Sequence, residues 1–254
     1  MQRFNTPFPS LMCLALLLLL IACWLSGIDK ALFLQLNNLS QLLPDYLWGF
    51  LTTLADPMVA PLLVFTLFHR NPLFLRAFFI AITLALLSNY SLKYGFGIER
   101  PTAILEPDTF NIIGPVIASP SFPSGHTLTI FTLMALVSSW YQKRSISALA
   151  LILAAIISFS RISVGAHWPS DLLFGALVGC FLGWLAVEIN SRLGKEVPEK
   201  IMLTTYFIAL LTGIISLINK TPYPSGQWLS TAVAMFTIAY ALKSITELLH
   251  RQKG

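Results

Sequence analysis

Residues 147–191 read SALALILAAIISFSRISVGAHWPSDLLFGALVGCFLGWLAVEINS, two apolar segments joined by a short polar one. The apolar parts, 147–163 and 171–191, are close to the length of about 20 residues with which a helix crosses the hydrocarbon layer. Helix is the expected state, because lipid leaves unpaired backbone groups unsatisfied and these segments lack the alternation of barrel strands. The stretch therefore predicts two transmembrane helices whose connecting loop contains arginine, histidine and aspartate.

The same pattern extends over most of the 254-residue chain, which is 56% hydrophobic and only 11% charged. Soluble proteins are about a quarter charged, so the composition indicates a membrane protein. Six further apolar stretches complete a predicted all-α, polytopic transmembrane helical bundle of eight spans: 11–28, 47–68, 73–92, 124–141, 201–218 and 229–246. The shorter segment 32–43 mixes apolar residues with asparagine, serine and glutamine, and we expect it to lie along the membrane interface.

Lysine and arginine residues are distributed unevenly between alternate loops. The loops on the side of the N-terminus contain Arg3, Arg70, Arg76, Lys143, Arg144, Arg192, Lys195, Lys200, Lys243, Arg251 and Lys253. The other side contains only Lys30, Lys93, Arg100, Arg161 and Lys220. The positive-inside rule therefore predicts that both termini are cytoplasmic. This asymmetry accounts for the net charge of +5, and no dense basic run suggests a nucleic-acid partner.

Two motifs with charged or polar residues lie at the predicted outer ends of the helices. Lys93 and Arg100 form Lys-x6-Arg-Pro after the third span, and Pro-Ser-Gly-His opens the fourth span with Ser124, Gly125 and His126. A helix N-terminus presents free N–H groups to an anion, glycine permits close backbone approach, and the serine hydroxyl adds a donor. Taken alone, these motifs are also consistent with cations that reach lipid head groups and with simple helix capping.

A third motif, Ser-Arg-x5-His-x3-Asp, connects the fifth and sixth spans. Arg161 can hold two phosphate oxygens, His167 can attack phosphorus or transfer protons, and Asp171 can orient the imidazole. A structural Arg161–Asp171 salt bridge is the alternative interpretation. All three motifs lie on the side where the positive-inside rule disfavours cations, so we expect an anionic ligand there. The fork geometry of arginine favours phosphate.

In this order, the three motifs resemble the signature of the type-2 phosphatidic-acid phosphatase superfamily. The resemblance implies that His167 is a nucleophile that forms a phosphohistidine, that Asp171 orients it, and that His126 protonates the leaving oxygen. It also implies phosphate binding, without a metal or other cofactor, by Lys93, Arg100, Arg161, Ser124 and Gly125. The resemblance covers about residues 93–171.

The family's six-helix core would occupy residues 1–195, which leaves two additional C-terminal spans, within 196–254, without an assigned role. Within the family, the chain is similar to the bacterial membrane lipid phosphatases, which include phosphatidylglycerophosphatase B and undecaprenyl-diphosphate phosphatase. This similarity implies hydrolysis of undecaprenyl diphosphate, phosphatidylglycerophosphate, phosphatidate or a lipid A phosphate. It also implies an inner-membrane protein with its site facing the periplasm, and no obligate protein partner is evident.

Two other activities stay open. A lipid-to-lipid phosphotransferase would pass the phosphate of the same intermediate to an acceptor lipid instead of water. A transporter of lipid-linked anions would also have many spans and a positive pocket. Transport usually requires a site near the bilayer midplane, whereas the charges in this sequence cluster at one membrane edge.

Three further features have a structural interpretation. Asp56-Pro57 interrupts the second apolar stretch, and we interpret it as a break in the helix rather than as part of the site. Residues 224–227, Pro-Ser-Gly-Gln, repeat the second motif without its histidine, and we interpret them as an ordinary turn. The cysteines lie in apolar stretches and are expected to be buried free thiols: Cys13, Cys23 and Cys180.

Overall fold

The computed structural model describes residues 10–251, which form helices and connecting loops with no strand, as predicted for an all-α bundle. The long elements are α1 (Ser10–Ser26), α3 (Asp45–Leu54), α4 (Val59–Phe68), α5 (Pro72–Phe96), α7 (Gly125–Tyr141), α8 (Arg144–Ser163), α9 (Pro169–Arg192), α10 (Glu199–Ile218) and α11 (Gln227–Arg251). Shorter elements lie at one end of the bundle: α2 (Asp29–Ser40), α6 (Pro101–Ile104), and the 3-10 helices η1 (Pro107–Thr109) and η2 (Pro224–Gly226).

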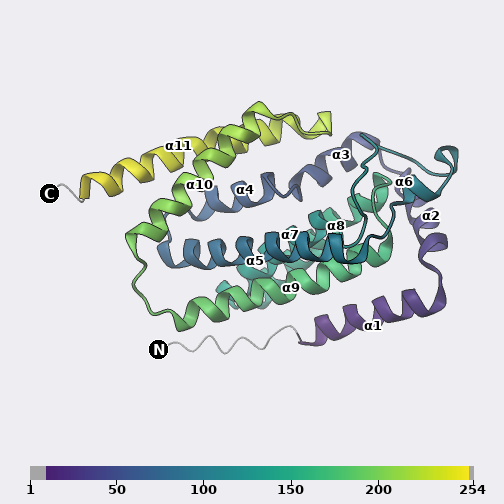
Figure 1. Cartoon of the computed structure of the whole chain (residues 1–254), viewed down its shortest axis with the longest axis horizontal. Coiled ribbons are helices and arrows are strands. Elements are labelled where there is room, and N and C mark those ends of the chain that lie inside the picture. The colour runs from purple at the N-terminus through teal and green to yellow at the C-terminus, as the bar shows by residue number, and fades with distance from the viewer. Residues whose placement is uncertain (1–9, 252–254) are drawn as a thin grey trace.

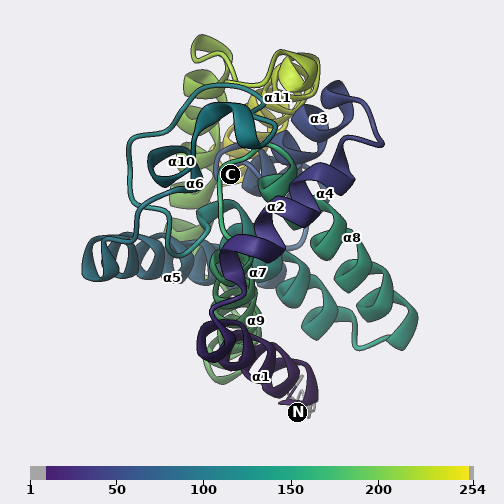
Figure 2. The ribbon, with the colours of Figure 1, turned by 90° about the vertical axis from the view of Figure 1, so that its right-hand side faces the viewer.

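The predicted spans all lie in helices, but not all of them are straight. Five helices of the described chain are long and apolar enough to cross a membrane alone, and the number rises to seven if two bent pairs each count as one span. The pair α3–α4 bends by 59° around Asp56-Pro57, which confirms the predicted break. The pair α1–α2 bends by 111°, so that α2 lies across the end of the bundle (Figure 2). The fourth predicted span, 124–141, corresponds to α7, a 17-residue helix near the centre of the bundle that is not among these seven.

Helices α7 and α9 pack closely because glycines follow one face of α9. Gly175, Gly179 and Gly183 recur every fourth residue and therefore share a face. A Cβ atom on Gly179 would lie 2.6 Å from a backbone carbonyl oxygen of α7, so no larger residue fits without displacement. Small residues at this spacing are typical of close helix pairs in membranes. The contact places the start of α7 beside the start of α9, where the Ser124 N–H donates to the Asp171 carbonyl oxygen at 3.2 Å.

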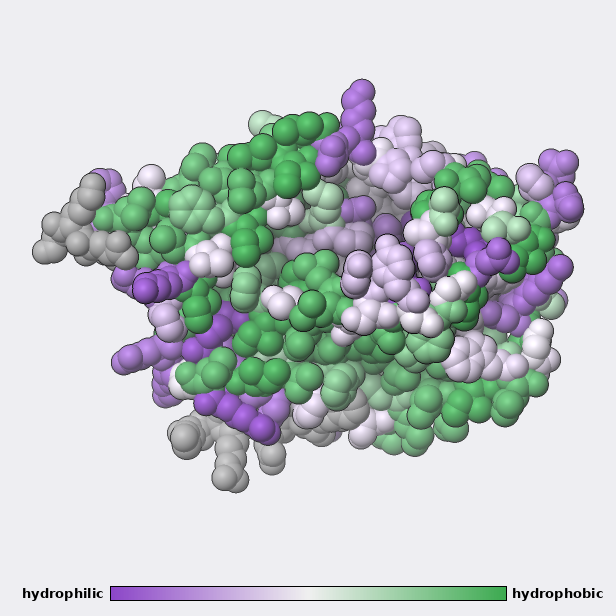
Figure 3. Space-filling view, viewed as in Figure 1, coloured by the Kyte–Doolittle hydropathy of each residue, from purple (hydrophilic) through white to green (hydrophobic). Residues whose placement is uncertain are grey.

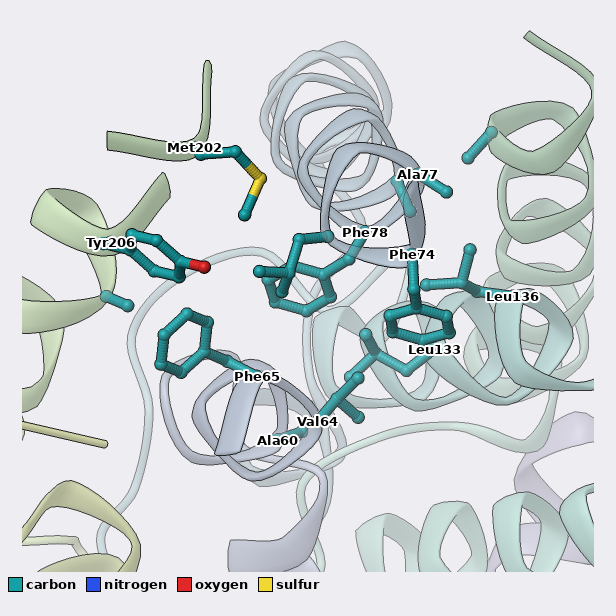
Figure 4. Close-up of a cluster of buried hydrophobic side chains, with 14 of the residues drawn as sticks. Ala60, Val64, Phe65, Phe74, Ala77, Phe78, Leu133, Leu136, Met202 and Tyr206 are labelled. Carbon is teal, nitrogen blue, oxygen red and sulfur yellow. The ribbon is translucent and has the colours of Figure 1, made fainter. Parts of the chain in front are cut away.

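The C-terminal helices α10 and α11 pack on each other and on the rest of the bundle through α4 and α5. Figure 4 shows the apolar cluster at this contact, in which Phe65 of α4 and Phe78 of α5 face Met202 and Tyr206 of α10. Between helices in a bilayer, such a contact is stabilised by close van der Waals packing rather than by removal of the side chains from water. The two C-terminal helices thus extend the bundle sideways. The predicted division into a six-helix core, 1–195, and a C-terminal part, 196–254, stays a prediction.

The two ends of the bundle carry different loops. Figure 1 shows the α4–α5 and α9–α10 connections at one end, together with the end of α11, and α2 and α6 at the other. A broad hydrophobic surface lies between ends that are richer in hydrophilic residues (Figure 3), as expected for a chain embedded in a bilayer. Arg3 and Lys253, counted above among the cytoplasmic cations, lie outside the described residues. The orientation of the bundle in the membrane stays a prediction.

Candidate active site

His167 and Asp171 form the centre of the candidate site, in the α8–α9 loop and the first turn of α9. His167 is 2% exposed, and its Nδ1 lies 3.1 Å from Oδ2 of the fully buried Asp171. The same carboxylate oxygen accepts from the Trp168 N–H at 2.9 Å, in a capping arrangement, and from the Ser121 hydroxyl. A carboxylate in this position keeps the proton on Nδ1 and leaves the lone pair on Nε2. The arrangement suits a nucleophilic imidazole.

Electrostatics favour the neutral form of His167. Burial lowers the pKa of this histidine well below its ordinary value of 6.5, and the positive charges of Arg100 and Arg161 lower it further. A lowered pKa means that the ring stays neutral at pH 7 and becomes protonated only in more acidic solution. The Nε2 lone pair is therefore available for attack at neutral pH.

Arg100 connects the two loops that flank His167. Its Nη1 donates to the Ala166 carbonyl oxygen at 2.7 Å and to His167 Nε2 at 3.1 Å. Its Nε donates to the Ser119 carbonyl oxygen at 2.7 Å, and its Nη2 donates to the Ser119 hydroxyl and the Pro120 carbonyl oxygen at 3.3 and 3.2 Å. All five N–H groups of the guanidinium thus have protein partners. Arg100 lies in the predicted site, but it must exchange one of these bonds before it can bind a phosphate oxygen.

Helix α5 brings two polar side chains to the same region. Lys93 Nζ lies 3.5 Å from the Ser119 hydroxyl, so the predicted cation reaches the loop that holds Arg100. Asn89, one turn earlier, packs against Gly125: a Cβ atom on this glycine would lie 2.9 Å from Asn89 Oδ1. Glycine at the start of α7 therefore permits the close approach of α5, in addition to any backbone contact with a ligand.

His126 lies in the first turn of α7, with its side chain 19% exposed. Its Nε2 is 3.8 Å from Oδ2 of Asp56, and Oδ1 of this aspartate accepts from the Met58 N–H at 2.8 Å at the start of α4. Ser124 caps α7 by accepting from the Thr127 N–H at 3.4 Å. The helix break that the sequence predicts thus also places a carboxylate beside the second histidine, which the interpretation as a simple break did not include.

Arg161, at the end of α8, does not form the alternative salt bridge with Asp171 anywhere in residues 10–251. It is 1% exposed, and its Nη1 donates to Thr52 Oγ1 at 2.5 Å and to the Tyr223 hydroxyl oxygen at 3.0 Å. Thr52 is completely buried and Tyr223 is 3% exposed. The guanidinium is therefore held by neutral hydroxyl groups, which leave its positive charge uncompensated and favour an anionic ligand.

Four contacting residues were absent from the sequence prediction: Thr52, Ser119, Ser121 and Tyr223. Ser121 lies two residues before the second motif, so its position was a usable signal. Thr52 and Tyr223 are separated from Arg161 by 109 and 62 residues, and nothing in their local sequence indicates the contact. Within residues 10–251, the structure contains no cluster of three or more His, Cys, Asp or Glu side chains that could hold a metal ion.

Comparison with known proteins gives consistent matches. The profile of the PAP2 superfamily matches residues 74–195. An undecaprenyl-diphosphatase from Sulfolobus acidocaldarius is 32% identical over 154 residues, which cover 58% of this chain and 65%, slightly less than two thirds, of that protein. A lipid A 4'-phosphatase from Bacteroides thetaiotaomicron is 30% identical over 189 residues, which cover 69% of this chain and 84% of that protein. The solved structure of LpxE from Aquifex aeolicus aligns with a TM-score of 0.56 and 33% identity, over 63% of this chain and 95% of that one.

Proposed function

This chain belongs to the PAP2 superfamily, and we propose that it hydrolyses a lipid phosphate or diphosphate through a phosphohistidine formed on His167. The observation that carries the proposal is the buried His167–Asp171 pair, with Nδ1 and Oδ2 3.1 Å apart. Arg100 contacts this histidine at 3.1 Å, and Arg161 supplies a further positive charge to the site. A neutral, oriented imidazole beside fixed cations is suited to nucleophilic attack on a phosphate group.

The proposed reaction has two steps. In the first, Nε2 of His167 attacks phosphorus, the bond between phosphorus and the lipid oxygen breaks, and His126 donates a proton to that oxygen. In the second, water attacks phosphorus and gives a proton to His126, while the bond between phosphorus and Nε2 breaks and releases phosphate. Asp171 holds the Nδ1 proton throughout, and Arg161 stabilises the charge on the phosphoryl oxygens. Arg100 withdraws its N–H from Nε2 when the substrate binds.

The substrate panel follows from the relatives, which are named for undecaprenyl diphosphate and lipid A, and from the family resemblance of the motifs. Purified protein in liposomes would be tested with undecaprenyl diphosphate, phosphatidylglycerophosphate, phosphatidate and lipid A. We expect release of inorganic phosphate from at least one of them. Transfer of labelled phosphate to a second lipid, with none in solution, would instead indicate a phosphotransferase. No reaction with any member of the panel would reject the proposal.

We expect Asp56→Asn to lower kcat roughly tenfold with little change in KM. This loss is smaller than the factor of about 100 to 10,000 that general acid catalysis as a whole contributes to a rate. His126 must carry a proton to act as an acid, and Asp56 is the carboxylate beside it, at 3.8 Å. Asparagine has the same shape and still accepts from the Met58 N–H, so the start of α4 is preserved. Steady-state kinetics would be compared with those of Asp108→Asn, which alters an exposed carboxylate in η1. Equal kcat values for the two variants would show that Asp56 only caps α4.

The predicted orientation places the site on the outer side of the membrane. A cysteine at Val116, which is 65% exposed in the loop before α7, should react with an impermeant thiol reagent in intact cells. A cysteine at Lys143, in the α7–α8 turn, should react only after the membrane is permeabilised. The native cysteines are buried and should give a low background. Labelling of the Lys143 position alone in intact cells would invert the orientation.

A further inference from the structure

Arg161 is held on one side only, although it is almost completely buried. Thr52 and Tyr223 both bind its Nη1. Its buried Nε has no hydrogen-bond partner within residues 10–251, and the same described range provides no hydrogen bond to its Nη2. A buried N–H without a partner costs about 1–3 kcal/mol, so the buried and unpaired Nε–H of Arg161 indicates a ligand. Nε and Nη2 form the edge of the guanidinium that can hold two phosphate oxygens in parallel.

Tyr223 comes from the α10–α11 loop, outside the residues 74–195 that match the family profile. Its ring lies beside the guanidinium, with 5.9 Å between the ring centroid and Cζ of Arg161. One edge of the ring packs on Gly114, where a Cβ atom would lie 2.8 Å from Cε1 of the tyrosine. The Gly226 N–H donates to the Tyr223 carbonyl oxygen at 2.9 Å and closes the first turn of η2. Both the ring and the backbone of Tyr223 are therefore fixed.

The loop that carries Tyr223 is docked on α3, the helix that also supplies Thr52. A Cβ atom on Gly49 of α3 would lie 2.5 Å from the Ser225 hydroxyl oxygen, and one on Gly226 would overlap the Thr53 side chain. Glycines on both surfaces thus allow η2 and α3 to pack in close contact, near the top of the bundle in Figure 2. The two hydroxyl groups that hold Arg161 consequently belong to one packed unit, of which the C-terminal helix pair is a part.

We propose that the C-terminal helix pair completes the phosphate site, and that Tyr223 is the residue that positions Arg161. The proposal rests on the proposed function, because it assigns the free Nε–Nη2 edge to the phosphoryl group of the lipid substrate or to the phosphate product. The Tyr223 hydroxyl oxygen accepts from Nη1 and fixes the rotation of the guanidinium. The free edge is thereby presented to phosphate before the substrate arrives, which reduces the cost of ordering the side chain on binding.

Tyr223→Phe tests this role, because phenylalanine keeps the ring and its packing and removes only the hydroxyl group. We expect roughly a tenfold weaker binding of orthophosphate, measured by 31P NMR titration, and a comparable rise in KM for the lipid substrate. The unfolding temperature should stay close to that of the wild type. The matched control is Tyr206→Phe: Tyr206 is also buried in the C-terminal pair, but its hydroxyl donates to the His69 carbonyl oxygen at 3.1 Å.

A second comparison separates positioning from general packing. If Tyr223 acts through Arg161, removing its hydroxyl in an Arg161→Lys background should weaken phosphate binding no further. Equal orthophosphate affinity in Tyr223→Phe, Tyr206→Phe and the wild type would overturn the proposal. If the wild type binds orthophosphate but hydrolyses no lipid, the proposed function is rejected. The orthophosphate affinities of Tyr223→Phe and Tyr206→Phe would still decide whether Tyr223 positions Arg161. A wild type that neither binds nor releases phosphate would reject both.

Discussion

Replacing His167 with alanine should lower phosphate release by about three orders of magnitude or more, because the proposed covalent intermediate forms on Nε2 of this histidine. The protein should remain folded, since Arg100 keeps its bonds to Ser119, Pro120 and Ala166. Alkaline quenching of the wild type during turnover of a 32P-labelled lipid should trap label on the protein, and alanine at 167 should abolish that label. The measurement thus tests the intermediate as well as the rate.

His69→Ala is the matched control for this substitution. His69 stacks on Tyr240 with 4.2 Å between ring centroids, and its Nδ1 lies 2.9 Å from the Thr66 carbonyl oxygen, so its removal also disturbs a packed imidazole. Its position at the α4–α5 connection is at the other end of the bundle (Figure 1). We expect phosphate release close to the wild-type rate. Near wild-type turnover by a well-folded His167→Ala variant would contradict the histidine mechanism.

The positions of the helices along the chain could be predicted from sequence, because they follow the hydrophobic stretches. Each predicted apolar stretch lies in a helix, and Asp56-Pro57 breaks the second one, because proline cannot continue the backbone hydrogen bonds of a helix. The three motifs could also be assigned to one end of the bundle, since alternate loops of a multi-span protein share a side. The hydrogen bond between Arg100 and His167 and that between Ser124 and Asp171 agree with this assignment.

The parts that sequence could not supply depend on contacts between distant segments. From its sequence, segment 224–227 is interpreted as an ordinary turn. In the structure, the preceding residue Tyr223 contacts Arg161, and η2 packs closely on α3, which no local pattern in the sequence indicates. The family resemblance of the Lys-x6-Arg-Pro motif implies that Arg100 binds phosphate. The sequence gives no indication that all five of its N–H groups already have partners, because those partners come from loops that only the fold brings together.

The two histidines of the site occupy different environments, and the difference matches the roles we propose. His167 is 2% exposed and paired with a buried carboxylate at 3.1 Å, which favours a neutral, rigid nucleophile. His126 is 19% exposed, and its Nε2 lies 3.8 Å from Oδ2 of Asp56, whose side chain is 25% exposed. A group that exchanges protons in each cycle needs such access, whereas a nucleophile benefits from exclusion of water. Burial therefore distinguishes the two rings where the motifs alone do not.

Arg161→Lys should reduce kcat/KM by about two orders of magnitude, even though the positive charge is retained. Lysine has no planar fork, so it cannot bind two phosphoryl oxygens in parallel while its other side contacts Thr52 and Tyr223. Because the side chain at this position is only 1% exposed, an ammonium group there would also have fewer partners than it has in water. Steady-state kinetics with a lipid phosphate, together with orthophosphate affinity, would measure both consequences.

Arg144→Lys is the corresponding control, because Arg144 opens the same helix at its opposite end and is exposed. This variant should keep wild-type kcat/KM. If Arg161→Lys were also fully active, charge alone would suffice at this position, and Arg161 would be a structural link between α8, α3 and the C-terminal pair. If instead phosphate affinity falls while the unfolding temperature is unchanged, the Nε–Nη2 edge that the protein leaves without partners is the edge that holds the substrate.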